Sequence, residues 1–491
     1  MYTQSNKQNL KQKTIKGFLW RFGERILSQL VSFVVSIVLA RLLLPQEYGT
    51  IALCMVFINV ISVLAVSGLG TSLVQKKDAD ELDFSTLFWA GMGMSVFLYM
   101  VLFFLAPVIS QVYQDEKVCS IFRVLGLVIP IQALNSIQQA SVSRKMEFKK
   151  FFYATTIGTI LSGFIGVAMA YLGYGVWALV GQQLSNNIIN AFVLNRIIEW
   201  RPQLHFSITR FKSLFSFGAC LMGATFFGTL LNELKSFIVG VRYTPADLAF
   251  YNRGDSFPKL IGNNVNNTII AVIFPAISQV QGNLDEVKRA MRRSMTTSSY
   301  IMSPILFWLA ATADSIVKIL LTDKWLPCVP YMRVLCLSYC ISILTTANLQ
   351  SINAIGRSDM TLKLEFYKKP FYLLAIIIGM FISPLAIAVA NTLYMVVELI
   401  INAIPNKRLI NYSFAEQLSD VAPQFILSLV MATIVYFIGL LNWNVWLTLA
   451  LQGVTGVTIY WLGSIQFSLE SYNYILSSIN TFKHQRSIEI K

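Results

Sequence analysis

Apolar segments of about 20 residues recur along this chain from its beginning to its end, separated by short polar connections. A helix of that length crosses the hydrocarbon core of a bilayer and satisfies its own backbone hydrogen bonds there. Of the 491 residues, 55% are hydrophobic and 13% are charged, whereas a soluble protein carries about 25% charged residues. The mean hydropathy is +0.60. The sequence therefore predicts an all-α polytopic membrane protein.

We expect about fourteen transmembrane helices, joined by short connections that carry turn residues. The last two spans are the most lipid-like, because no charged residue lies between Asp420 and Glu470. The predicted spans lie near residues 18–41, 48–70, 84–106, 118–142, 151–171, 174–195, 213–241, 250–276, 291–312, 328–352, 364–382, 384–404, 421–441 and 444–465.

The distribution of lysine and arginine predicts the orientation of these spans. When the N-terminus and every second connection are assigned to the cytoplasm, most of the 39 basic residues fall on that side. Both termini are therefore expected in the cytoplasm. The net charge of +15 then reflects topology and contact with anionic membrane lipids, so we expect no nucleic-acid partner.

The first span has one polar face. From Gly17 to Arg41 it is about 36 Å long as a helix. Polar residues recur on it at steps of three or four, which is the spacing of one helix face: Arg21, Arg25, Ser28, Ser32 and Ser36. The carboxylate of Glu24 lies on the flank of the same turns. A membrane helix with one polar face needs an interior for that face, so we expect it to line a cavity.

Three short motifs recur in the same order and with nearly the same spacing. Pro45-Gln46-Glu47 matches Pro245-Ala246-Asp247, the segment 122–127 matches 332–337, and Arg144 matches Arg357. We therefore predict two six-helix lobes, residues 1–205 and 206–412, followed by a C-terminal helix pair and cytoplasmic tail over 413–491. Six spans are an even number, so the halves are related by an axis along the membrane normal. Transporters built in this way place their substrate path between the halves.

Several segments resemble one family of membrane transporters. They are residues 39–49 (LARLLLPQEYG), 175–180 (GVWALV), 251–254 (YNRG), 274–278 (FPAIS) and 323–327 (DKWLP). Together they look like the Wzx-type polysaccharide flippases of the MOP exporter superfamily, closest to the colanic acid exporter branch. The resemblance covers about residues 16–467. It departs at Lys235, where many relatives carry an acidic residue; here the acid is Glu233, two positions earlier.

The resemblance implies a fold and a cargo. It implies two lobes around a central cavity that opens alternately to each side of a bacterial inner membrane. The implied cargo is an undecaprenyl-pyrophosphate-linked oligosaccharide, flipped from the cytoplasmic to the periplasmic leaflet for surface polysaccharide export. A polysaccharide polymerase or export machinery is the implied protein partner. No enzymatic activity and no cofactor are expected, and coupling to protons or to sodium stays open.

Such a cargo needs cations for its phosphates in an otherwise apolar membrane. The candidate cavity cations are Arg21, Arg25, Lys235, Arg253, Lys368 and Lys369. Arg21 and Arg25 rank first, because a guanidinium offers a planar fork to phosphate oxygens. The alternative for both is an ordinary flank residue whose charge reaches the headgroups. Lys368 and Lys369 follow Glu365 at three and four residues, so they form either a surface ion pair or a substrate contact.

Carboxylates within the spans are candidates for ion coupling or for the cavity lining. They are Glu24, Glu233, Glu365 and Glu398. Glu398 lies in the apolar body of its span, where a proton or sodium site and an interhelical partner are both open. Arg123 and Arg333 occupy matching repeat positions, so they are candidates for a periplasmic gate or for a structural role. Cys336 and Cys340 share a helix face without a histidine or carboxylate at metal spacing, so no metal site is expected.

Two other functions fit the sequence less well. A membrane enzyme that uses the same lipid-linked sugar would be expected to carry reactive residues in a large outer loop, and the predicted outer loops are short. The two histidines, His205 and His484, fall on the predicted cytoplasmic side. A small-molecule or drug exporter of the same superfamily typically has twelve spans and a less basic cavity.

The predicted topology can be tested by accessibility. Single cysteines placed at Lys149 and at Lys288, in a chain whose own cysteines are replaced, should react with a membrane-impermeant maleimide only when it reaches the cytoplasmic face. A matched cysteine at Tyr174 should react only from the outside. Labelling of either lysine position in intact cells would contradict the fourteen-span arrangement.

Overall fold

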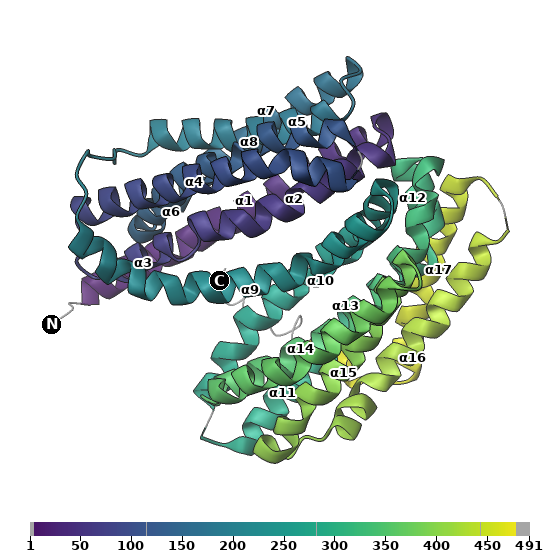
Figure 1. The fold of residues 1–491 in the computed structure, drawn as a ribbon. Helices are drawn as coiled ribbons and strands as arrows, with labels where there is room; N and C mark the ends of the chain where they lie inside the picture. The colour runs from purple at the N-terminus through teal and green to yellow at the C-terminus, as the bar shows by residue number, and fades with distance from the viewer. Residues whose placement is uncertain (1–3, 114, 281, 442, 478–491) are drawn as a thin grey trace, which may run out of the picture. The chain divides into compact units, whose positions relative to one another are not determined.

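The computed structural model describes residues 4–113, 115–280, 282–441 and 443–477. The chain forms two compact units, residues 1–249 and 250–491, and each is described by itself. Every regular element in the described part of the chain is a helix (Figure 1). This confirms the predicted all-α class. The C-terminal half of the predicted cytoplasmic tail lies outside the described residues.

The first unit is a bundle in which α7 packs against both α1 and α8 (Figure 1). The second helix, α2, contacts α4, α6 and α9 and lies at the centre of these contacts. The helices are α1 (Gln4–Leu42), α2 (Pro45–Val66), α3 (Leu69–Gln75), α4 (Glu81–Tyr113), α5 (Glu116–Leu125), α6 (Val128–Lys145), α7 (Phe148–Tyr171), α8 (Val176–Ile197) and α9 (Ile208–Arg242).

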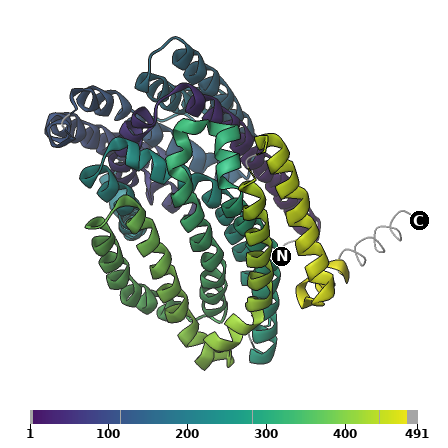
Figure 2. The same cartoon turned by 90° about the vertical axis from the view of Figure 1, so that its right-hand side faces the viewer.

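The second unit is a bundle around α11 and α13, which pack against each other and against α16 and α15 respectively. The last two helices, α16 and α17, run side by side and are yellow in Figure 2. The elements are α10 (Pro245–Gln279), α11 (Leu284–Ala311), α12 (Ala313–Leu321), the 3₁₀ turn η1 (Asp323–Cys328), α13 (Val329–Ala354), α14 (Ser358–Met380), α15 (Pro384–Ile410), α16 (Phe414–Gly439) and α17 (Val445–Gln466). The unit boundary falls near the start of α10, between Ala249 and Phe250.

Among the described residues, nine helical segments are long and apolar enough to cross a membrane, and eleven if two bent pairs each count as one span. The bent pairs are α9, which turns by 49° between Ser216 and Gly218, and α11 with α12, which meet at 70°. Helices α8, α10 and α14 have the length of a span but are more polar. These helices are consistent with the predicted fourteen spans, and that exact count stays a prediction.

The repeated Pro-x-acid motif marks two helix starts. Proline opens α2 and α10, where its missing N–H costs no hydrogen bond. Three residues after the cap position, Glu47 accepts from the backbone N–H of Leu44 at 2.7 Å, and Asp247 accepts from that of Thr244 at 3.1 Å. Both copies of the motif therefore form the same helix N-terminus, with a proline at the first turn and an acidic side chain that caps it.

The two motifs also lie against each other within the first unit. A Cβ on Gly49 would lie 1.7 Å from the carbonyl oxygen of Pro245, so only glycine permits this approach. A second close approach joins Gly68, with φ of +83°, to the backbone of Gly218 in α9. Small residues therefore let α9 and the start of α10 pack tightly on the first unit.

The compact units and the repeat-defined lobes are different divisions of the chain. The repeat predicts that the second lobe begins at residue 206, whereas α9 packs with α2, α3 and α4 in the first unit. The predicted lobes, 1–205 and 206–412, therefore stay a proposal about internal symmetry, and the observed packing boundary lies one helix later.

Candidate functional site

In α1, two predicted cavity residues form an ion pair. Arg21 Nη1 lies 2.8 Å from Glu24 Oε2, at the i, i+3 spacing of one helix face. The Arg21 guanidinium also lies 4.7 Å from the centre of the Phe151 ring at the start of α7. Glu24 is buried, with 8% of its surface exposed. Arg21 is therefore held by α1 and α7 together, and its charge is balanced.

Arg25, one turn further along α1, has a different environment. It is exposed and makes no ion pair with any residue that the structure describes. Elsewhere on the same helix, Trp20 packs edge-on against Phe152, with the ring centres 5.2 Å apart. Lys149 Nζ lies 5.6 Å from the Trp20 ring. Arg25 is therefore an exposed guanidinium without an ion pair to the described residues, and Trp20 of the same helix has aromatic and cationic neighbours.

The first unit contains a cavity of about 460 Å³ between the α2–α3 turn, α6 and α9. Hydroxyl and amide side chains dominate its polar lining: Ser67, Thr71, Ser136, Gln139, Ser143 and Thr225. Hydroxyls and amides both donate and accept hydrogen bonds, which is the property that sugar hydroxyls require. Sequence reasoning missed this cavity because its residues come from three separate segments.

The acidic residue of the seventh predicted span is paired across helices. Asn59 Nδ2 of α2 donates to Glu233 Oε1 of α9 at 3.0 Å. Lys235 is partly buried and has an interaction partner of its own. Glu233 of α9 is therefore held against α2 by a hydrogen bond.

In the second unit, Lys368 is fully buried between two carboxylates. Its Nζ lies 2.6 Å from Glu365 Oε1 on α14 and 3.0 Å from Glu398 Oε1 on α15. A second lysine, Lys369, reaches Glu365 Oε2 at 3.2 Å. Tyr372 and Tyr394 stack edge-on beside the cluster, with ring centres 5.1 Å apart. Two cations and two carboxylates therefore balance across the α14–α15 contact.

The two lysines, which are neighbours in the sequence, have different environments in the structure. The ammonium group of Lys368 has no exposed surface and holds two helices together. Lys369 keeps 41% of its side chain exposed and remains able to meet an anion. Glu398 has an interhelical partner, Lys368, which is one of the two roles that the sequence left open for it.

The remaining predicted arginines make local contacts within their own units. Arg253 is buried and its guanidinium lies 5.0 Å from the centre of the fully buried Trp325 ring. Arg123 stacks at 4.4 Å on Phe103, and Arg333 pairs with Asp314. The proposed gate role of the last two is an open proposal.

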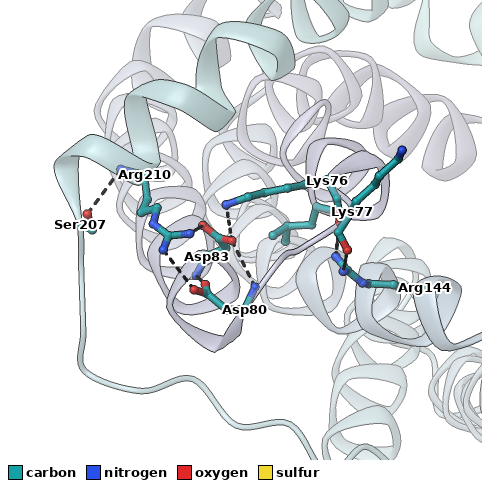
Figure 3. Close-up of polar contacts among 8 residues, drawn as sticks. Lys76, Lys77, Asp80, Asp83, Arg144, Ser207 and Arg210 are labelled. Carbon is teal, nitrogen blue, oxygen red and sulfur yellow. Dashed lines mark hydrogen bonds and ion pairs between the residues drawn. The ribbon is translucent and has the colours of Figure 1, made fainter.

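A second polar cluster, missed from the sequence, joins the start of α9 to the α3–α4 turn (Figure 3). The carboxylate of Asp83 is fully buried and contacts Lys76 Nζ at 2.5 Å and Arg210 Nη1 at 3.1 Å. Arg210 also reaches Asp80 at 3.2 Å. Arg144 closes the network by donating to the backbone carbonyls of residues 73, 76 and 77.

The network has a local electrostatic cause. The backbone N–H of Asp83 donates to Asp80 Oδ1 at 2.9 Å, and this bond, with the nearby charge of Arg210, holds the pKa of Asp80 below its usual range. Because the pKa of Asp80 is lower in the folded state, this contact stabilises the fold at pH values above the usual carboxyl pKa. The stabilisation is lost as the pH falls through the folded-state pKa. The sequence signal that could have indicated this network is the pair of acids three residues apart, Asp80 and Asp83, before an apolar run.

No metal-binding group of three or more histidine, cysteine or acidic residues occurs in the described ranges. The exposed guanidinium of Arg25 suits an anion, and the hydroxyl-lined cavity suits a polar neutral group.

The chain is similar to a known protein family and to several proteins of polysaccharide biosynthesis. A family model described as "Polysaccharide biosynthesis protein" matches residues 38–330. The lipopolysaccharide biosynthesis protein WzxC of Escherichia coli is 22% identical over 443 residues, 88% of this chain and 89% of WzxC. The succinoglycan biosynthesis transport protein ExoT of Rhizobium meliloti is 23% identical over 63% of this chain and 62% of ExoT. The teichuronic acid biosynthesis protein TuaB of Bacillus subtilis is 25% identical over 60% of this chain and 61% of TuaB.

Solved structures with the same fold include two kinds of transporter. The lipid II flippase MurJ, in an inward closed conformation, superposes with a TM-score of 0.72 over 92% of this chain and 98% of MurJ, at 15% identity. An inward-facing multidrug resistance MATE transporter of the MOP superfamily gives a TM-score of 0.61 over 80% of this chain and 99% of that chain, at 12% identity. At these identities the similarity shows the fold.

The buried lysine cluster generates a stability prediction. Lys368→Ala should leave Glu365 and Glu398 without their shared cation in an apolar environment, at a cost of about 3–5 kcal/mol. Lys369→Ala removes a half-exposed partner of the same carboxylate and should cost less than about 1 kcal/mol. Thermal unfolding of the purified protein in detergent compares the two.

The double variant Lys368→Ala/Glu398→Gln should recover part of the loss, because one of the uncompensated carboxylates is gone. Equal unfolding temperatures for Lys368→Ala and Lys369→Ala would show that the Lys368 contacts do not stabilise the fold.

Proposed function

Because the chain belongs to the polysaccharide biosynthesis protein family, we propose that it flips an undecaprenyl-pyrophosphate-linked oligosaccharide from the cytoplasmic to the outer leaflet. The relatives are named for the biosynthesis or transport of succinoglycan, lipopolysaccharide and teichuronic acid, all surface polysaccharides. The fold that it shares with MurJ and MATE transporters supports movement of the cargo by alternating access.

The observation that carries the proposal is the contrast between Arg21 and Arg25 on one helix. Arg21 is balanced by Glu24, whereas Arg25 is exposed and has no ion-pair partner among the described residues. An unpaired arginine at the start of a membrane helix supplies the planar pair of donors that phosphate oxygens bind best. Arg25 is therefore the proposed capture residue.

The hydroxyl-lined cavity in the same unit supports the second requirement of such a cargo. A lipid-linked oligosaccharide brings many hydroxyl groups into a region with little water, and each must be hydrogen-bonded. Side chains such as Thr71, Gln139 and Ser143 offer donors and acceptors together. We assign this cavity to the sugars and Arg25 of α1 to the pyrophosphate.

The roles of the second unit are also part of the proposal. Lys369 is the remaining candidate for a phosphate contact there, because Lys368 is engaged by two carboxylates. Glu398 is the candidate coupling group for a proton or a sodium ion. Either would compete with Lys368, whose Nζ lies 3.0 Å from the Glu398 carboxylate.

The cellular setting follows from the proposed cargo. Both termini are placed in the cytoplasm, and the membrane is the bacterial inner membrane, where the lipid-linked precursor is made. A polysaccharide polymerase or export complex is the proposed partner that receives the flipped product. The protein itself acts as a transporter, without a catalytic residue.

The test is complementation of a strain that lacks its own flippase, with the amount of each variant in the membrane measured alongside. A desolvated Arg–phosphate bond contributes about 1.5–3 kcal/mol, so Arg25→Ala should weaken capture by about ten- to a hundredfold. Arg25→Lys keeps the charge and should be impaired less, and Arg25→Glu should be impaired most.

Arg357→Ala is the matched control, because Arg357 is an equally exposed arginine that pairs with Asp359 in its own helix turn. Full surface polysaccharide with Arg25→Ala and Arg25→Glu, at normal membrane levels, would place the capture site elsewhere.

A further inference from the structure

The second unit contains a cationic cavity that the proposed transport path does not use. It has a volume of about 530 Å³ and lies between the start of α11 and the residues that follow α17. Three arginines line it, Arg289, Arg292 and Arg293, together with Glu286 and Glu470. In the predicted topology, these residues lie at the cytoplasmic face of the membrane.

Two of the three arginines are free of carboxylates. Arg292 contacts Asp420 at 3.0 Å and Glu470 at 3.4 Å, so its charge is compensated. Arg289 and Arg293 make no ion pair with the residues that the structure describes, and Arg293 stacks at 4.3 Å on Tyr474. Glu286 is the one lining carboxylate outside an ion pair, and the two unpaired arginines outnumber it.

Two hydroxyl groups at the cavity also lack partners. The side-chain oxygens of Thr297 and Ser471 are buried, and neither has a hydrogen-bond partner among the described residues. Ser471 is only 2% exposed. A buried hydroxyl without a partner is unfavourable, and an anionic oxygen in the cavity would satisfy it.

An apolar groove of about 480 Å³ continues from this cavity. The two share Ala290, Arg293, Thr297 and Tyr474. The other apolar lining residues of the groove are Val265, Ile269, Ile273 and Ile277 on α10 and Ile301 on α11. The α10 residues recur at steps of four, so they form one stripe along that helix.

Polarity changes in one direction along α11. Arg289, Arg293, Thr297 and Ile301 follow at steps of four on one face, from two cations through a hydroxyl to an alkyl group. The same order of chemistry, charged group, polar linkage and hydrocarbon, is found in a membrane lipid. The cavity and the groove are therefore two ends of one amphipathic site.

We propose that this site binds one molecule of an anionic glycerophospholipid from the cytoplasmic leaflet. The phosphodiester accepts hydrogen bonds from Arg289, Arg293, Thr297 and Ser471, and an acyl chain lies along the α10 stripe and Ile301. The binding does not depend on which cargo the protein transports.

The experiment is native mass spectrometry of the purified full-length protein, incubated with phosphatidylglycerol or with phosphatidylcholine of the same acyl chains. One phosphatidylglycerol molecule should be retained with at least about tenfold preference over phosphatidylcholine, since a charge-assisted bond contributes about 1.5–3 kcal/mol. Arg289→Ala should lower its retention by about tenfold, and Ile301→Trp, which fills the groove, should lower it with the arginines intact.

Arg357→Ala is the matched control and should retain phosphatidylglycerol as the unmodified protein does, and unfolding temperatures identify any variant that fails to fold. Equal retention of both lipids, or unchanged retention in both Arg289→Ala and Ile301→Trp, would overturn the proposal. Undecaprenyl pyrophosphate that displaces phosphatidylglycerol at equal concentration would also overturn it, since the site would then belong to the transported lipid.

Discussion

A hydrocarbon environment supplies no hydrogen bonds, so every polar group carried into it needs a partner within the protein. The Glu365–Lys368–Glu398 cluster shows this constraint most clearly, because a fully buried ammonium joins α14 to α15 through two carboxylates. The bond between Asn59 and Glu233 serves α2 and α9 in the same way. In both units, helices that are too polar to face lipid on all sides are held by contacts of this kind.

The same constraint distinguishes structural polar residues from residues available to a ligand. Arg21 and Lys368 carry charges that are already compensated, whereas Arg25 has no ion pair with a described residue. Arg21 and Arg25 look equivalent in sequence, but only Arg21 has a carboxylate three residues away on its own helix face. Uncompensated charge at the membrane interface is what a phosphate-bearing lipid recognises.

The fold was predictable where the signal is local. Apolar length predicted the helices, and the Pro-x-acid motifs, which the sequence offered only as a repeat, lie at the starts of α2 and α10. The lysine cluster was only partly predictable: Glu365 and Lys368 lie within one turn, but Glu398 is 30 residues away and nothing in the spacing indicates that it meets Lys368. The hydroxyl-lined cavity and the Asp83 network each combine segments from three parts of the chain, so no single window of sequence carries their signal.

We propose that this protein moves a pyrophosphate-linked oligosaccharide across the bilayer. The most direct measurement reconstitutes the purified full-length chain into liposomes that contain an undecaprenyl-pyrophosphate-linked oligosaccharide, and follows its exposure to a sugar-modifying enzyme on one side. Wild-type vesicles should expose the cargo faster than protein-free vesicles, and vesicles with Arg25→Glu should lie close to the protein-free rate. Equal exposure rates for folded wild-type protein and protein-free vesicles, with a cargo drawn from the organism's own polysaccharide pathway, would contradict the account.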